Sequence, residues 1–238
     1  MIHELRFYSV TNGRMADANR RFTHYFPSFF PRHGVRCVAA WNALAGPGAP
    51  RFVYLLAYAD FAEREAVWAS FYADPEWARI RAETNAGHEM IERHDLMFLK
   101  PNAAWQSDSK TNSPEMVAGE LHEMVVQQIA PGQNAGVNAF LSSTYLPQLL
   151  DAGARSLGIF DMASGGGMPQ LVLLHAWRDA AAWYRGRLSM DTAVPLDEAF
   201  TAQRQKLGQP FFGRAEVNLL APVPGVAFDR SLGRGAAA

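Results

Sequence analysis

The sequence predicts an α+β fold in which two tandem ferredoxin-like repeats form a dimeric α/β barrel within one chain. Three observations support this: the chain repeats itself, each copy has the same order of predicted elements, and the composition is globular. Of the 238 residues, 49% are hydrophobic and 19% are charged, and the net charge is −1. This balance argues against disorder and gives no basic surface for nucleic acid or an anionic membrane.

The internal repeat appears when the sequence is shifted by 119 residues. The segment His3–Gly13 then lies on His122–Gly132, and the register continues without a gap to Asp60 over Asp179. Beyond that point the register shifts by about two residues. Identical pairs include Glu4/Glu123, Asn19/Asn138, Gly34/Gly153, Arg36/Arg155, Val53/Val172, Leu55/Leu174 and Ala57/Ala176.

The repeat divides the chain into two domains. We expect residues 1–104 to form an N-terminal ferredoxin-like repeat and residues 117–225 to form a C-terminal one. Residues 105–116 between them are polar and rich in turn formers, which is typical of a linker. Residues 226–238 are predicted to be a tail.

Each copy is predicted to run strand, helix, strand, strand, helix, strand, which is the ferredoxin-like order. One such sheet carries helices on one face, so its other face needs a partner, and a second copy supplies one. Two independent domains are the alternative, which leaves two apolar sheet faces in water. In copy one the predicted strands are Ile2–Val10, Val35–Ala43, Phe52–Ala59 and Glu92–Leu99, and the predicted helices are Arg14–Pro31, Phe61–Phe71 and one that begins at Asp74-Pro75.

Copy one contains a set of short motifs. They are Glu4-Leu5-Arg6 with Tyr8 and Gly13, His33-Gly34, Trp41, Ala57-Tyr58, Glu63-Arg64-Glu65 and Asp74-Pro75-Glu76-Trp77. Taken together, these motifs resemble the NIPSNAP family of the dimeric α/β-barrel group. Copy two departs from this pattern, with Val125 in place of Arg6 and Gln127 in place of Tyr8, so its assignment depends on the internal alignment.

The resemblance implies the barrel fold and a tendency to form a homodimer or higher homo-oligomer. It implies little chemistry, because proteins that share this barrel include cofactor-independent monooxygenases, isomerases, dehydratases and haem proteins. The reaction must therefore be argued from the residues of the site.

Strand alternation divides the predicted core from the predicted pocket. Val53, Leu55 and Ala57 are identical in the two copies, so we assign them to helix packing, and we assign the differing alternate residues to the interior of the barrel. The resulting site is a mainly apolar pocket between the two sheets. Its predicted catalytic residues are His175, Glu4 and Arg6, and its predicted substrate-binding residues are Tyr8, Trp41, Tyr54, Tyr58, Phe160 and Trp177.

The role of His175 stays open at this point. A neutral imidazole on a buried strand can serve as a general base, orient a ligand, bind haem or a metal, or be a core histidine bonded to a carbonyl. Glu4 and Arg6 can likewise form a catalytic pair or a structural ion pair.

Other chemistry-bearing residues favour structural interpretations. His88 and Glu92 are four residues apart, but that spacing needs a helix and we place Ile91 onward in a strand, so no metal site is predicted. Cys37 lies among apolar neighbours and is expected to be an inert thiol. Gly165–Gly167 is expected to be a loop and not a phosphate cradle, because it opens no helix.

These observations favour a small-molecule-binding barrel protein, and specifically an enzyme that needs no cofactor and acts on a small apolar or aromatic compound. A non-catalytic binding or scaffold protein of the NIPSNAP type is one alternative. A haem-dependent barrel enzyme with His175 as axial ligand is another. The start MIHELRFY lacks an apolar signal-peptide core, and no run approaches the roughly 18 apolar residues of a membrane span, so we expect a cytoplasmic protein.

Overall fold

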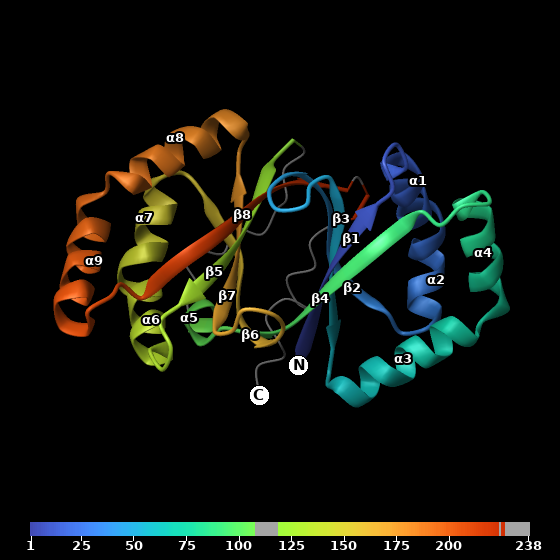
Figure 1. The fold of residues 1–238 in the computed structure, drawn as a ribbon, viewed down its shortest axis with the longest axis horizontal. Helices are drawn as coiled ribbons and strands as arrows, with labels where there is room; N and C mark the ends of the chain where they lie inside the picture. Colours follow the sequence, from blue (N-terminus) through green and yellow to red (C-terminus); the bar gives the residue numbers. More distant parts are fainter. Residues whose placement is uncertain (108–118, 224, 227–238) are drawn as a thin grey trace. The chain divides into compact units, whose positions relative to one another are not determined.

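The computed structural model describes residues 1–107, 119–223 and 225–226 (Figure 1). The chain divides into two compact units, the first comprising Met1–Leu99 with the C-terminal residues from Ala221, the second Lys100–Leu220. The hydrogen-bonded strand order β1-β3-β2-β8-β5-β7-β6-β4 is that of a closed barrel. The predicted fold class is confirmed.

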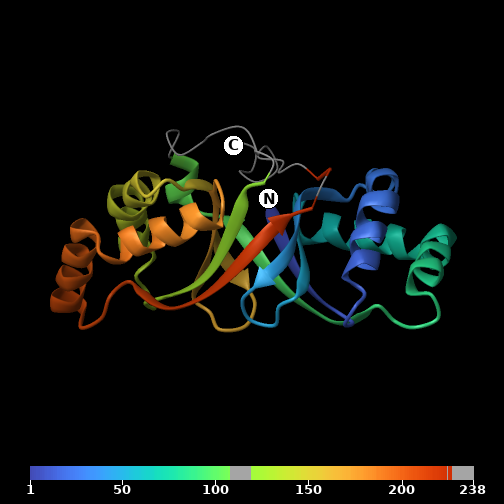
Figure 2. The same ribbon diagram turned by 90° about the horizontal axis from the view of Figure 1, so that it is seen from above.

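The first unit is a four-stranded antiparallel sheet with helices on one face (Figures 1 and 2). Its strand order is β4-β1-β3-β2, as the ferredoxin-like prediction requires. The strands are β1 (Ile2–Val10), β2 (Arg36–Ala45), β3 (Arg51–Tyr58) and β4 (Ile91–Pro101), and the helices are α1 (Met15–Arg20), α2 (Phe26–Arg32), α3 (Phe61–Ala73) and α4 (Pro75–Asn85).

The predicted helix Arg14–Pro31 is present but contains a π-helical segment, η1 (Arg21–Tyr25), between α1 and α2. Such wider turns occur frequently at functional sites. The helix start predicted at Asp74-Pro75 is also confirmed. The Asp74 carboxylate accepts a hydrogen bond from the Glu76 backbone N–H at 2.8 Å, and Pro75 occupies the first turn of α4.

The second unit repeats this order with the strands arranged β8-β5-β7-β6. Helices α3 and α8 still begin 119 residues apart, so the two-residue shift arises later, before the last strand of each copy. The strands are β5 (Leu121–Ile129), β6 (Arg155–Ser164), β7 (Gln170–Trp177) and β8 (Phe212–Pro222), and the helical segments are α5 (Ala103–Ser107), α6 (Asn134–Phe140), η2 (Leu141–Tyr145), α7 (Leu146–Asp151), α8 (Ala180–Asp191) and α9 (Val194–Leu207).

The predicted domain boundaries differ slightly from the two compact units and stay a prediction. Helix α5 lies in the second compact unit although residues 103 and 104 were assigned to the first repeat. Residues 108–116 of the predicted linker, residues 117, 118 and 224 of the predicted C-terminal repeat and residues 227–238 of the predicted tail lie outside the described residues.

The face assignment of the third strand in each copy is wrong. Tyr54, Leu56 and Tyr58 pack in one core cluster with helix residues such as Phe22 and Trp68, so they face the helices. The identical residues on the alternate positions lie on the opposite face of β3. The helical layers of the two copies differ in sequence, and the strand residues beneath them differ with their packing partners.

The first strand follows the same corrected pattern. Glu4, Arg6 and Tyr8 pair across β1 and β3 with Leu56, Tyr54 and Phe52, which are residues of the helix-side cluster. In the second unit, a Cβ built on Gly186 of α8 comes within 2.2 Å of the Trp177 ring, which places Trp177 against α8.

The second strand behaves differently because of a β-bulge. The register between β2 and β3 shifts between Cys37 and Ala39, so Cys37 faces the helices while Trp41, opposite Val53, faces away from them. The second unit has a matching bulge, and its Phe160 lies opposite Val172. A bulge adds one residue and reverses the alternation beyond it.

Among the described residues, none of the helices combines the length and the apolar character needed to cross a membrane.

Candidate functional site

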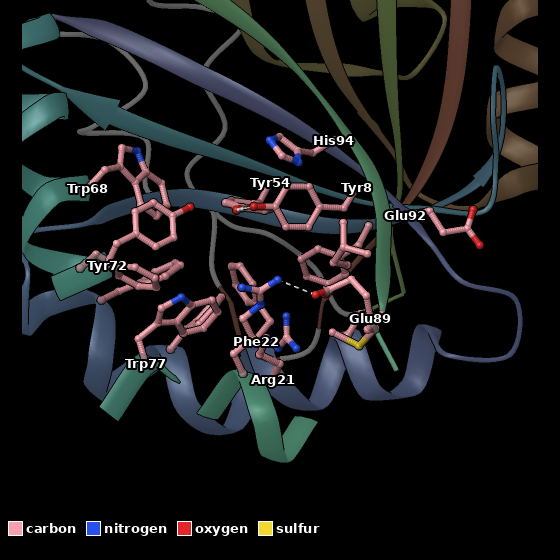
Figure 3. A pocket seen from close by; sticks show the side chains of 18 residues that line it. Tyr8, Arg21, Phe22, Tyr54, Trp68, Tyr72, Trp77, Glu89, Glu92 and His94 are labelled. Carbon is pink, nitrogen blue, oxygen red and sulfur yellow. Dashed lines mark hydrogen bonds and ion pairs between the residues drawn. The ribbon is translucent and has the colours of Figure 1, made fainter. Parts of the chain in front are cut away.

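A cavity of about 380 Å³ lies in the first unit between the helix-facing side of the sheet and the helices (Figure 3). Its lining is mostly aromatic, with a few charged side chains. The aromatic side chains are Tyr8, Phe22, Phe26, Phe30, Phe52, Tyr54, Trp68, Phe71, Tyr72 and Trp77, and the titratable ones besides tyrosine are Arg21, Arg81, Glu89, Glu92 and His94.

The helical wall of the cavity results from residues spaced four apart. Phe22, Phe26 and Phe30 recur at that spacing, so they share one helix face. The rings of Phe26 and Phe30 stack with centroids 4.2 Å apart, and Phe22 lies 5.4 Å from Tyr54 on the sheet. Tight packing around this space leaves its apolar shape well defined.

The sheet wall carries a pair of tyrosine hydroxyls. Tyr54 donates a hydrogen bond to Tyr8 Oη at 2.7 Å. Burial raises the pKa of both phenols, although the Arg6 guanidinium acts in the opposite direction. Both hydroxyls therefore stay protonated near neutral pH, and the hydrogen of Tyr8 remains available for an oxygen atom of a ligand.

A buried charge cluster lies behind this tyrosine pair. The fully buried Glu4 accepts hydrogen bonds from Arg64 at 2.7 and 3.1 Å, and Arg6 Nη1 lies 3.5 Å from the same carboxylate. The Arg6 guanidinium lies 4.4 Å from the Trp68 ring centroid and about 5.5 Å from the Tyr8 ring centroid. One carboxylate thus faces two guanidinium groups, and the cluster carries a net positive charge. The Glu4–Arg6 ion pair is present; a catalytic role for it stays a prediction.

Arg21 brings a second buried cation to the cavity. Its Nε donates to Thr84 Oγ1 at 2.7 Å and its Nη2 donates to Asn85 Oδ1 at 2.6 Å, so both partners are neutral. Burial lowers the pKa of this guanidinium. The sequence-based analysis missed Arg21, although its position beside Phe22 on the apolar stripe of the helix could have indicated a buried arginine.

The acidic residues and His94 lie toward β4. His94 faces Tyr8 across β1 and β4, with ring centroids 5.7 Å apart. Glu89 is held by Arg81 at 2.6 Å, and Glu92 points away from the other labelled side chains in Figure 3. The imidazole thus lies beside the Tyr8 ring, and both side chains are of kinds that can exchange a proton with a ligand.

The structure does not bring the predicted site residues into one place. Of the predicted substrate-binding residues, Tyr8 and Tyr54 line the cavity; Tyr58 is fully buried beside it. Trp41 and Phe160 lie on the faces directed away from the helices of their own units. Trp177 and His175 belong to the helix side of the second unit, and neither lines the described cavity.

His175 lies in a packed polar core. Its Nε2 is 3.3 Å from the hydroxyl of Tyr145, and burial lowers the pKa of the imidazole to about 4. The nearby Glu123 accepts hydrogen bonds from Trp177, Trp183 and Arg187 at 3.1, 2.8 and 2.7 Å. Burial alone would raise the pKa of Glu123, but the hydrogen bonds from Arg187 bring it below its ordinary value. This geometry suits a structural histidine.

The sequence favours structural interpretations for both the segment of the chain around Ile91 and the Cys37 thiol. Within the described ranges, no group of three His, Cys, Asp or Glu side chains could hold a metal ion, and Ile91 onward is a strand as predicted. Burial raises the pKa of the Cys37 thiol to about 12, so little thiolate forms at neutral pH, as expected of an inert cysteine.

Comparison with known proteins supports the resemblance of the first copy. The NIPSNAP family model matches residues 3–105. A NIPSNAP domain protein from Burkholderia xenovorans is 23% identical over 43% of this chain and 96% of its own, with a TM-score of 0.38. No curated protein matches the chain. The predicted NIPSNAP resemblance is therefore confirmed for the N-terminal repeat.

Two solved structures resemble the whole chain at low identity. A protein from Lactobacillus acidophilus, provisionally assigned as a monooxygenase, is 8% identical and covers 96% of this chain and 99% of its own, with a TM-score of 0.59. A mutant chlorite dismutase from Candidatus Nitrospira defluvii is 4% identical and covers 93% and 92%, with a TM-score of 0.53. At such identities the likeness extends to the fold and not to the reaction.

Proposed function

We propose that the N-terminal repeat binds a small, largely apolar or aromatic molecule in the cavity between its sheet and its helices. The observation that carries this proposal is the volume of about 380 Å³ with an aromatic lining. Ligand sites typically have volumes of roughly 300–1,000 Å³ and combine apolar walls with a few placed polar groups. Here the tyrosine pair and Arg21 supply those polar groups.

The finer part of the proposal is that the protein is an enzyme that acts on this molecule without a cofactor. Tyr8 is the group best placed to donate a hydrogen bond or a proton to a ligand oxygen, and His94 lies beside it as a proton acceptor. We place the chemistry here and not at His175, whose side chain is fully buried against Tyr145. Removing a positioned acid typically lowers a rate by about 10²–10⁴-fold, which is the effect expected of Tyr8→Phe on turnover.

A non-catalytic binding protein would use the same cavity. For such a protein, Tyr8→Phe would weaken ligand binding slightly, and there would be no turnover for the substitution to reduce. The haem alternative needs an open face beside His175, and the contact of its Nε2 with Tyr145 at 3.3 Å gives that alternative no support.

Calorimetric titration with neutral aromatic probes tests the binding site. We expect 2-naphthamide to bind the wild-type chain and to lose at least about tenfold in affinity in Ala18→Leu. Ala18 is buried and lines the cavity, so a larger side chain there fills it. Ala16 lies on the same helix but is exposed, which makes Ala16→Leu the matched control. Failure of both 2-naphthamide and indole to bind, or equal affinity in both variants, would overturn the proposal.

A further inference from the structure

Two buried arginines, one in the cavity lining and one behind it, carry positive charge that the neighbouring carboxylates do not fully balance. We propose that the ligand of the cavity is an organic anion, with a carboxylate bound at Arg21 and an apolar or aromatic body among the phenyl rings. This inference rests on the proposed function and adds the chemical class of the ligand.

Arg21 is the first part of the evidence. The residue is 7% exposed and lines the cavity directly. Its two hydrogen-bond acceptors are neutral, the Thr84 hydroxyl and the Asn85 amide oxygen, and among the described residues no carboxylate lies within ion-pair distance of it. Glu89, which is itself paired with Arg81, is the acidic group that acts on it from farther away. The Nη1 of Arg21 makes no hydrogen bond within the same part of the chain. A buried cation is stable only with compensation, and an anionic ligand supplies it.

Arg6 is the second part. Its Nε and Nη1 have no hydrogen-bond partner among the described residues, and its side chain is 5% exposed. Glu4 is the nearest carboxylate, but Arg64 already holds both of its oxygens. Two guanidinium groups thus share one carboxylate, and the excess positive charge of the cluster lies directly behind the Tyr8, Tyr54 and Trp68 rings of the cavity wall. It therefore raises the potential inside the cavity without contacting the ligand.

The acidic groups near the cavity do not cancel this charge. Glu89 is paired with Arg81, and the Glu92 carboxylate, at the edge of the lining, points away from Arg21 and the other labelled side chains (Figure 3). A carboxylate suits Arg21, because a guanidinium presents parallel donors to two carboxylate oxygens. The aromatic lining then requires that the rest of the molecule be apolar.

A pair of isosteric probes tests the charge. At pH 7.5, 2-naphthoate is an anion and 2-naphthamide is neutral, and the two have nearly the same shape. We expect wild type to bind 2-naphthoate at least about tenfold more tightly by calorimetry. In Arg21→Gln the ratio of the two affinities should be less than about two. Arg6→Val introduces the residue found at Val125 in the second repeat, and there the ratio should be about threefold smaller than in wild type.

Controls separate this proposal from simpler explanations. Arg20 is exposed on the same helix and does not line the cavity, so Arg20→Gln should keep the full preference. Arg21→Lys keeps the charge and should keep most of the preference, and melting curves of all variants establish that they are folded.

The outcomes distinguish this inference from the proposed function. Equal affinity of wild type for the two probes, or a preference that survives both Arg21→Gln and Arg6→Val, would overturn the anion assignment while leaving the cavity as a binding site. A preference lost in Arg20→Gln would assign it to surface charge and overturn the inference as well. Absence of binding by either probe would overturn the proposed function itself.

Discussion

The two repeats use equivalent positions under their helices in different ways. In the first repeat, this layer contains the aromatic cavity, whereas in the second the rings of Phe140, Tyr145 and Phe212 pack against one another with centroids 5.2–6.4 Å apart. Ala18 of the cavity corresponds to the larger Val137 at the same repeat position. The second copy has side-chain volume where the first has space.

The charged residues sharpen this comparison. Glu4 and Glu123 occupy equivalent positions on the first strands, and each is held by an arginine of the helix above it. The helix positions have exchanged residues, with Arg64 and Trp68 in one copy and Trp183 and Arg187 in the other. In the second repeat, where Val125 replaces Arg6, one arginine and two indole N–H groups hold the carboxylate. In the first repeat Arg64 alone donates to both oxygens of Glu4, so Arg6 adds a second cation to a carboxylate that is already bound.

The largest effect should come from removing the buried carboxylate of the second repeat. Glu123→Gln leaves Arg187 without its partner, and breaking a buried ion pair in this way costs about 3–5 kcal/mol in the free energy of unfolding. Chemical denaturation measures it, and naphthoate binding below the transition should be unchanged.

Glu216→Gln is the control, because that exposed carboxylate should change the unfolding free energy by less than about 0.5 kcal/mol. An equal, small effect of both substitutions would mean that the polar core does not stabilise the second repeat.

A medium effect is expected from His175 and depends on pH. Burial holds its folded-state pKa at about 4, below the unfolded value of about 6.5, so the folded state is stabilised above pH 6.5 and this stabilisation is lost as the pH falls toward 4. The maximal loss is about 3 kcal/mol. His175→Leu, which introduces the residue of Leu56, should make the melting temperature less sensitive to pH between 6.5 and 4.

His122 has a similarly lowered pKa of about 4, so a part of the acid sensitivity should remain in that variant. Naphthoate binding at pH 7.5 should persist. If binding were lost in a folded His175→Leu protein, the sequence-based assignment of His175 to the site would be right and the cavity assignment wrong.

The smallest effect concerns helix capping. Asp74 caps α4, whereas Ala193, the equivalent residue before α9, has an extended backbone but makes no side-chain cap. Asp74 accepts from the N–H of Glu76, but the equivalent Pro195 has no backbone N–H, so the new carboxylate could accept only from Leu196. Ala193→Asp should therefore stabilise the chain by only about 0.5 kcal/mol, the lower end of the range for a cap, measured by denaturation. No gain would indicate that the Leu196 N–H, which donates to the Ala193 carbonyl oxygen at 3.1 Å, is not available to a capping carboxylate.

The elements of the fold could be predicted because their signals are local. The Asn12-Gly13 turn that follows Ile2–Val10 and the cap at Asp74-Pro75 are signals of a few residues each and do not depend on distant packing. Which face of each strand packs against the helices could not be predicted. Identical residues in the two copies show that both copies use that face in the same way, but they do not show whether it contacts the helices or the interior of the barrel. The bulge after Cys37 also reverses the alternation without any marker in the sequence.

The candidate site was predicted only in part for a related reason. Tyr8 and Tyr54 were predicted to share a site, and their hydroxyls do meet at 2.7 Å, but they meet on the helix side of the sheet and not between the two sheets. Their role in binding a substrate stays a prediction. Arg21 was missed because a charged residue beside an apolar helix stripe can be identified as part of a site only when the cavity next to it is known. Whether the described cavity is empty or filled depends on the volumes of side chains from eight separate helices and strands, which no local pattern encodes.

Duplication within one chain has a consequence for the evolution of such a site. In an assembly of two identical subunits, every mutation appears twice, so a cavity opened in one half is also opened in the other. Here the halves are encoded separately, and Ala18 and Val137 can diverge. Selection can keep one copy for stability while the other accumulates changes for binding. The chain should accordingly bind one molecule of ligand, not two.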